Sequence, residues 1–200
     1  MALLFFTDTE TTGLPNKSLP RDHASQPHIV QVAAILYDDQ RESIEAQLEA
    51  IVRPEGYTID NNSEAVKTHG VTHERAMDYG LPAPLVANTL LRMIDMADKF
   101  VAYNEGFDHF MLLRLFGLFD FPCERLGNMV RMCMMTKAKP VCKIPPTQKM
   151  LDAGFTDYKS PKLGEAYLHC FGTPLDGAHS AFIDVRATLR LYRHFMKNGA

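Results

Sequence analysis

The stretch that most constrains the fold is Leu3–Leu14, which reads Leu-Leu-Phe-Phe-Thr-Asp-Thr-Glu-Thr-Thr-Gly-Leu. An apolar run ends in two carboxylates, Asp8 and Glu10, and the pattern breaks at Gly13. In a β-strand successive side chains alternate between faces, so both carboxylates would point the same way. Their repulsion is removed when a hard cation such as Mg²⁺ or Mn²⁺ lies between them. Two interpretations follow: a strand with a metal site, or a strand that runs out into a polar loop.

The bulk composition is that of an ordinary globular protein, with 46% apolar and 22% charged residues. A length of 200 residues predicts one domain, residues 1–200, with a sizeable core. No apolar run approaches the ~20 residues that span a membrane, and the amino-terminal residues lack the basic region of a signal peptide. Four cysteines without Cys-x-x-Cys spacing are typical of reduced thiols, which favours a cytoplasmic protein. The net charge of −3 disfavours a protein that coats nucleic acid through bulk charge.

The hydrophobic pattern predicts an α/β fold with one mixed five-stranded sheet flanked by helices. The expected strands are 3–8, 29–38, 42–52, 99–103 and 129–135. The expected helices are 63–69, 72–77, 82–97, 108–116, 160–170 and 181–197. Short links between the first three strands favour a three-stranded antiparallel meander, and in the third strand Ile44, Ala46, Leu48 and Ala50 should share one face. The segments 15–27 and 136–162 are expected to be largely irregular.

Two further carboxylates stand out. Asp108 is expected at a strand-to-helix junction, where an aspartate is either a simple helix cap or a group presented beside Asp8 and Glu10, because ligands gather at strand ends. Asp184 falls on the stripe of the last helix that should pack against the sheet, where an unpaired charge is costly. Asp184 therefore needs a cation or another partner.

The remaining polar residues of this region are placed differently. His179 is expected in the loop before the last helix, where it could reach over bound metals or be an ordinary surface residue. Four basic residues fall on the side of the helix opposite Asp184, and the pattern indicates a solvated face that is not part of the site. They are Arg186, Arg190, Arg193 and Lys197.

Three short motifs resemble, in order, the exonuclease motifs of the DEDDh 3′–5′ exonucleases. This family is also called DnaQ-like, after the proofreading subunit of bacterial DNA polymerase III. The motifs are Asp8-Thr-Glu10, Asn104-x-x-Phe107-Asp108 and His179-x-x-x-x-Asp184. Each motif alone is weak, but all three in order, with histidine five residues before aspartate, are highly specific. The resemblance covers nearly the whole chain.

The resemblance implies an RNase H-like fold and a metal-dependent hydrolase. It implies two divalent cations, Mg²⁺ or Mn²⁺, held by Asp8, Glu10, Asp108 and Asp184, with His179 as general base. Two such cations can hold the attacking and leaving oxygens of a phosphodiester during hydrolysis. The expected activity is removal of nucleoside 5′-monophosphates from the 3′ end of DNA, preferentially single-stranded DNA.

The resemblance also suggests residues that contact the strand. Glu64 and His69 resemble a glutamate and histidine that proofreading subunits place near the terminal nucleotide, and Leu14 resembles an apolar wedge beside the terminal bases. Simpler interpretations remain, because His69 could only end a helix and Leu14 could be an ordinary loop residue. The predicted substrate-binding residues are Thr11, Thr12, Gly13, Leu14, Glu64, His69, Asn104 and Phe107. The lysines of 136–162 are either a phosphate-binding patch or a solvated loop.

Some positions depart from the family pattern. Tyr103 stands where many members have histidine, Glu105-Gly106 replaces small residues, and the 15–27 loop is longer than in compact members. No residue is identified that would read the 2′-hydroxyl group distinguishing RNA from DNA. Two alternatives therefore stay open: an exoribonuclease on the same scaffold, and a nucleic-acid-binding module without catalysis. Service in a replication or repair complex is also open.

Overall fold

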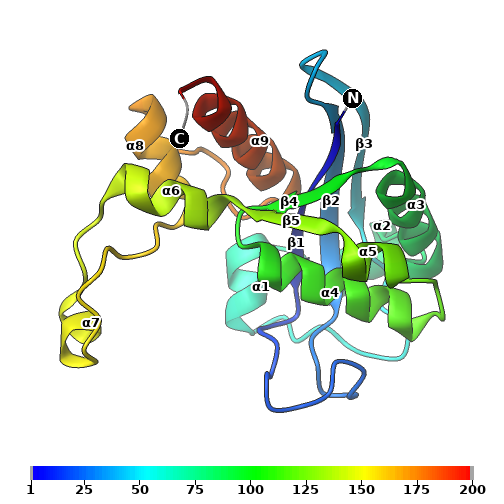
Figure 1. The fold of residues 1–200 in the computed structure, drawn as a ribbon. Helices are drawn as coiled ribbons and strands as arrows, with labels where there is room; N and C mark the ends of the chain where they lie inside the picture. Colours follow the sequence, from blue (N-terminus) through cyan, green and yellow to red (C-terminus); the bar gives the residue numbers. More distant parts are fainter. Residues whose placement is uncertain (1, 199–200) are drawn as a thin grey trace.

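The computed structural model describes residues 2–198 and contains one mixed sheet with the strand order β3-β2-β1-β4-β5 (Figure 1). Strands β1 (Leu3–Thr11), β2 (Ile29–Asp38) and β3 (Ser43–Ile51) form an antiparallel meander. Strand β4 (Lys99–Ala102) pairs parallel to β1, and β5 (Val130–Cys133) pairs parallel to β4. The predicted five-stranded sheet, with its meander and two further strands, is confirmed.

Helices flank the sheet and connect its strands. They are α1 (Glu64–His69), α2 (His73–Tyr79), α3 (Ala83–Met96), α4 (Glu105–Leu118), α5 (Glu124–Asn128), α6 (Met134–Cys142), α7 (Gln148–Asp152), α8 (Leu163–Phe171) and α9 (Ala181–Asn198). Helix α1 is capped by Ser63, whose hydroxyl accepts a hydrogen bond from the Val66 N–H, and it ends at Gly70, whose φ is 70°. Within the described residues, no helix has the length and apolar character needed to cross a membrane.

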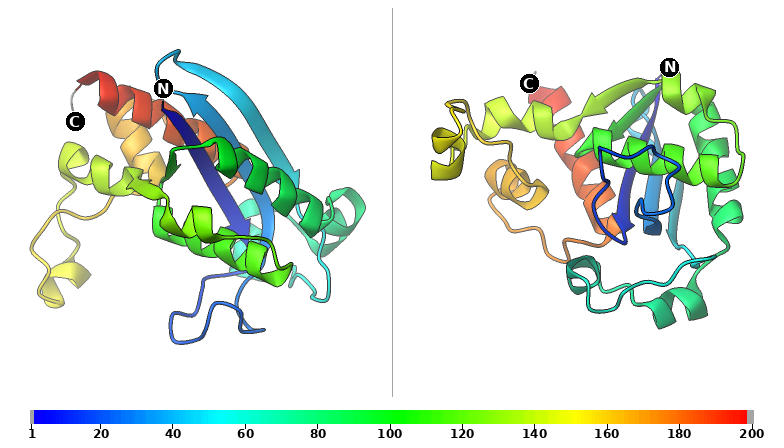
Figure 2. Two further views of the ribbon diagram at one scale, coloured as in Figure 1. Left: turned by 45° about the vertical axis from the view of Figure 1, so that its right-hand side comes forward. Right: turned by 90° about the horizontal axis from the view of Figure 1, so that it is seen from below.

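Helices cover both faces of the sheet (Figures 1 and 2), and an apolar core lies on each side of it. Phe5 of β1 packs in the core formed with α3 and α4, whereas its neighbour Phe6 packs in the core formed with α6, α8 and α9. The ring of Phe6 lies edge-on to that of Tyr192 in α9, with the centroids 5.3 Å apart. Because side chains alternate along a strand, Asp8 and Glu10 share the face of Phe6 and point toward α9.

Several predicted boundaries are wrong, and one segment predicted to be largely irregular also contains helices. The 136–162 segment contains most of α6 and all of α7, and the chain between α6 and α8 extends away from the body with α7 near its tip (Figure 1). Helix α8 begins at Leu163 and not at Ser160, since the N–H of Lys162 binds the Glu165 carboxylate at 2.7 Å. Helix α4 begins at Glu105, before Asp108.

The expected common face of β3 is interrupted at Ile44. Leu36 of β2 pairs with Ala46, but the next residue, Tyr37, pairs with Ile44, so the register shifts by one residue. A shift of one residue moves a side chain to the opposite face of a strand. Ile44 is 42% exposed and does not join the core that contains Ala46.

Candidate active site

Four carboxylates from three elements meet at the edge of the sheet where β1 ends. Asp8 and Glu10 lie half-buried on β1, Asp108 lies on α4 with 3% of its surface exposed, and Asp184 lies in the first turn of α9 with 8% exposed. Asp8 feels the charges of the other three groups. The structure thus brings together the two strand carboxylates and the two helix carboxylates that the sequence singled out.

Burial raises the pKa of each member of this cluster, and repulsion from the other carboxylates raises it further for Asp8 and Glu10. The pKa of Asp8 lies well above its ordinary value, first because of burial and then because Asp108, Asp184 and Glu10 are close. Burial, followed by repulsion from Asp184 and Asp108, raises the pKa of Glu10 to about 8. Burial also raises the pKa of Asp108 to about 7 and raises that of Asp184. The four groups therefore cannot all ionise near neutral pH unless positive charge compensates them.

Asp108 is held by a contact that sequence reasoning missed. Thr9 lies on the opposite face of β1 from Asp8, and its hydroxyl donates a 2.8 Å hydrogen bond to Oδ1 of Asp108. The helix cap of α4 is Asn104, so the interpretation of Asp108 as a simple cap is wrong. The sequence held one signal for this contact. Thr9 lies between Asp8 and Glu10 in β1, so its side chain must face the opposite layer of helices, which contains α4.

His179 lies in the loop before α9, as the sequence predicts, and its side chain is exposed. Its backbone has φ 70°, and its N–H donates a 3.1 Å hydrogen bond to Oδ2 of Asp184. One ring nitrogen of His179 and one carboxylate oxygen from each of Glu10 and Asp184 lie within 4.8 Å of one another. This histidine is therefore close enough either to accept a proton at the site or to bind a metal ion there.

The first turn of α9 is also tied to the sheet by Gln31. This buried side chain of β2 pairs in register with Glu10, and its Oε1 accepts a hydrogen bond from the Ala181 N–H at 3.4 Å. Sequence reasoning did not select Gln31. A single polar residue within the apolar run of β2 was the signal that could have found it.

The turn after β1 is braced by its own threonines. The Thr11 hydroxyl donates to the carbonyl of Gly13 at 2.7 Å, and the Thr12 hydroxyl accepts from the His28 N–H at 3.0 Å. Leu14 follows this turn, and the residue is 86% exposed. The structure therefore presents Leu14 to solvent from a fixed turn, next to the strand that carries Glu10.

Of the other predicted contact residues, His69 has a hydrogen bond to the end of β1, whereas Glu64, Asn104 and Phe107 have other surroundings. His69 of α1 donates from Nε2 to the Thr11 carbonyl (3.3 Å) and accepts from the Val71 N–H at Nδ1 (3.0 Å), and burial lowers its pKa. It thus joins α1 to the end of β1 near the carboxylates. Glu64 instead is exposed and lies 2.6 Å from Lys67 of the same helix. Asn104 is exposed at the start of α4, and Phe107 packs partly buried against the core.

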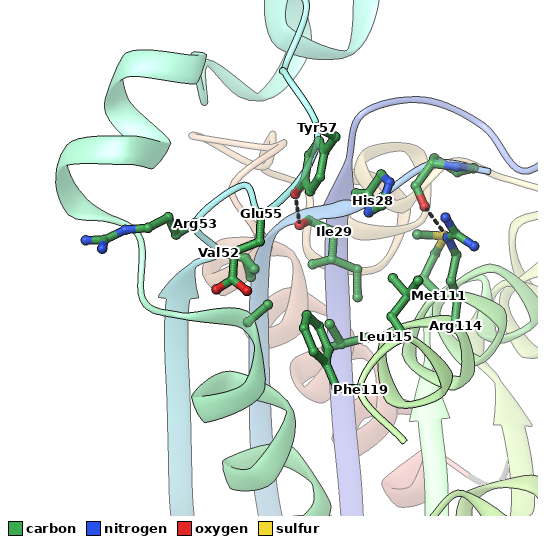
Figure 3. Close-up of a pocket in the computed structure, with 13 residues that line it drawn as sticks. His28, Ile29, Val52, Arg53, Glu55, Tyr57, Met111, Arg114, Leu115 and Phe119 are labelled. Atoms are coloured by element: carbon green, nitrogen blue, oxygen red, sulfur yellow. Dashed lines mark hydrogen bonds between the residues drawn. The ribbon is translucent and has the colours of Figure 1, made fainter. Parts of the chain in front are cut away.

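The 15–27 loop is anchored from α4. The buried Arg114 guanidinium donates to the carbonyls of Pro27 (2.9 Å), Arg21 (2.6 Å) and Gln26 (3.2 Å). A cavity of about 150 Å³ lies beside this contact, and His28 and Tyr57 stack above it with ring centroids 3.8 Å apart (Figure 3). The loop is therefore irregular, as predicted, but it is fixed to the scaffold that holds the site.

Residues 5–192 match the RNase T exonuclease family. The chain belongs to this exonuclease family. A comparison with curated protein sequences finds no similar relative.

Solved structures of Escherichia coli exonuclease I share the fold of this exonuclease-family chain. The complex with a dT13 oligonucleotide is 17% identical, with a TM-score of 0.76. The zinc-bound complex with single-stranded DNA and the complex with a dA16 oligonucleotide are each 18% identical, with TM-scores of 0.75. Each match covers 98% of this chain and 41% of the exonuclease I chain, so the chain spans about two fifths of that protein. The RNase H-like fold is confirmed.

Proposed function

We propose that this chain is a DEDDh-type 3′–5′ exodeoxyribonuclease that removes nucleoside 5′-monophosphates from single-stranded DNA. The observation that carries the proposal is the cluster of four carboxylates beside an exposed loop histidine at the end of β1. Membership of the exonuclease family supports it, and the exonuclease I structures with dT13 and dA16 support DNA as the polymer. We further propose that residues 1–200 act as one exonuclease domain, since both cores share one sheet.

The donor set fits divalent cations such as Mg²⁺ or Mn²⁺. All four carboxylates offer hard oxygen ligands, and Oδ1 of Asp184 is buried without a hydrogen-bond partner. Asp8, Glu10, Asp108 and Asp184 would hold a pair of such ions. Bound there, the ions would neutralise the cluster and supply Lewis-acid activation of the attacking water and of the phosphodiester.

The residues around the cluster would then hold its groups in place and remove the proton from the attacking water. His179 would take the proton of the attacking water at a ring nitrogen, since this side chain is exposed and lies next to Glu10 and Asp184. The Asp184 carboxylate would hold the backbone of His179 through the 3.1 Å hydrogen bond. The Thr9 hydroxyl would keep Asp108 oriented toward the cluster.

The turn after β1 would receive the 3′ end of the strand. Leu14 is exposed and would pack against the terminal bases, with Thr12 and Gly13 fixing the turn beneath it. His69 would support this platform from α1 through its bond to the Thr11 carbonyl. Leu14→Ala should therefore raise KM for the strand several-fold without lowering the melting temperature, because an exposed leucine contributes little to the core.

One assay tests the proposal. Single-stranded DNA, duplex DNA and RNA of one sequence, each labelled at the 5′ end, are incubated with the protein and Mg²⁺ or Mn²⁺. We expect a ladder that shortens from the 3′ end, release of 5′-monophosphates, and single-stranded DNA as the fastest substrate. Faster loss of RNA would replace the proposal with the exoribonuclease alternative. Binding without any shortening would indicate a module that has lost catalysis.

A further inference from the structure

The basic residues on the outer side of α9 line a groove. The sequence pattern indicated a solvated face, and these side chains are exposed, but α8 stands beside them and closes a groove of about 800 Å³. Its basic residues are Arg186, Arg190, Arg193 and Lys197, together with His194. No acidic side chain is among the described residues that line it. Ile44 also lines the groove, because the register shift in β3 turns it away from the core.

Aromatic rings and a guanidinium group are stacked on one wall. The Arg190 guanidinium lies 4.0 Å from the centroid of Phe171 and 5.1 Å from that of Tyr167. The two rings belong to α8, and their centroids are 4.7 Å apart. Arg190 also donates a hydrogen bond to the Tyr167 hydroxyl. Aromatic faces and arginine planes of this kind are surfaces on which unpaired bases stack.

The groove begins next to the carboxylate cluster. Ile183, which lines it, precedes Asp184 in α9, and Leu175 belongs to the loop that carries His179. From Ile183 to Lys197 the helix rises about 21 Å, at about 1.5 Å per residue. At the ~3.4 Å spacing of phosphates along a duplex strand this length spans at most about six nucleotides. A strand whose 3′ end lies at the cluster could therefore continue along α9.

We propose that this α8–α9 groove binds single-stranded DNA upstream of the 3′ end, an inference that rests on the proposed function. Arg186, Arg193 and Lys197 contact phosphates, and a base stacks against the wall formed by Phe171 and Arg190. The combination of stacked aromatic rings with a lining residue next to Asp184 in sequence favours a nucleic acid strand over an acidic peptide, which would need the charges but not the rings.

One acidic residue competes with the strand from outside the lining. Glu42 lies 3.2 Å from Arg193 and also 3.2 Å from Lys197. Exposed ion pairs of this kind contribute little to stability, so a phosphate can displace the carboxylate. The pairing therefore leaves both cations available to the strand.

Binding measured as a function of strand length tests the groove. Fluorescence anisotropy with EDTA present compares strands of about 4 and about 16 nucleotides, the range of site sizes common for single-strand binding. Arg190→Ala should weaken binding of the long strand about tenfold more than binding of the short strand, which corresponds to about 1.4 kcal/mol. Arg92→Ala, an exposed arginine on α3, is the matched control and should change neither.

A second variant guards against loss of folding. Arg186→Gln removes one charge, which lies 5.4 Å from the ring centroid of Phe182. It should lower the slope of log K against log salt by about 0.7, the value for one phosphate contact with a single strand. Equal effects on both lengths, or an unchanged salt slope, would overturn the groove proposal while leaving the exonuclease proposal intact. If the groove variants change the sedimentation of the protein but not its affinity for the strand, the groove instead binds a second copy of the chain. Absence of any strand shortening by the unaltered protein would count against the exonuclease proposal itself.

Discussion

Helix α9 belongs to two regions that differ in both charge and burial. On its inner side, Asp184 is 8% exposed and adds its charge to three other carboxylates. On its outer side, Arg186, Arg190 and Arg193 are exposed and face a groove. A buried carboxylate is costly without a compensating cation, so its presence alone indicates a site. Exposed cations cost little, and only the neighbouring α8 gives them a defined surface.

Removing one inner carboxylate should produce the largest effect. Asp8→Asn should lower turnover on the order of 10³-fold, because an uncharged amide is a poor ligand for divalent cations and leaves the cluster without a complete metal site. Calorimetric titration with Mn²⁺ should show weakened binding in the same variant. Asp95→Asn, on the exposed side of α3, is the control. Unchanged Mn²⁺ affinity in Asp8→Asn would count against the assignment of the metal site.

The next largest effect separates two roles of the loop histidine. His179→Ala should lower turnover about 10²-fold, at the lower end of the range for loss of a general base, while Mn²⁺ affinity stays within about twofold. His23→Ala, on the exposed 15–27 loop, is the control. If Mn²⁺ affinity falls together with turnover, His179 is a metal ligand, which its distance from Glu10 and Asp184 also permits.

The carboxylate cluster on the inner side of α9 should also make the stability of the metal-free protein depend on pH. Folding raises the pKa of Glu10 from 4.5 to about 8 and that of Asp108 from 3.8 to about 7. Between about pH 4 and pH 8 the folded state therefore holds protons that the unfolded chain has already released, so stability falls as pH rises. In EDTA, the melting temperature should drop by roughly 5 °C or more from pH 5 to pH 8.

Two controls sharpen this measurement. Added Mg²⁺ should recover the loss at pH 8, because an ion that binds only the folded state stabilises it. Asp8→Asn should make the melting temperature depend less on pH, since the variant removes one charge from the cluster. A melting temperature that rises over this pH interval in EDTA would contradict the electrostatic description of the inner region.

The smallest effect concerns the outer region. Glu42→Gln should strengthen binding of a long single strand a few-fold, because Arg193 and Lys197 lose their shared partner and gain availability for phosphate. The free energy of unfolding should stay nearly unchanged, as expected for exposed ion pairs. Weaker strand binding in this variant would indicate that Glu42 organises the groove and does not compete for it.

Parts of the fold could not be predicted because long-range contacts overrode local signals. Ser160-Pro161 has the local pattern of a helix start, but the Tyr103 hydroxyl binds the Pro161 carbonyl at 2.9 Å and the helix begins later. The sequence predicts a largely irregular 136–162 segment, yet Pro140 lies inside α6, whose buried residue Ala138 packs in the same core as α9. Local propensity loses in both places to packing against distant elements.

The sequence by itself determined the faces of the key carboxylates. Asp8 and Glu10 share a strand face and Asp184 points inward from α9 because the periods of strands and helices depend only on neighbouring residues. The tertiary structure decided how these groups are held and what surrounds them. Thr9 reaches Asp108 across 99 positions of sequence, and Gln31 reaches Ala181 across 150. Contacts between such distant residues, like the groove between α8 and α9, exist only after the chain has packed, so no local pattern encodes them.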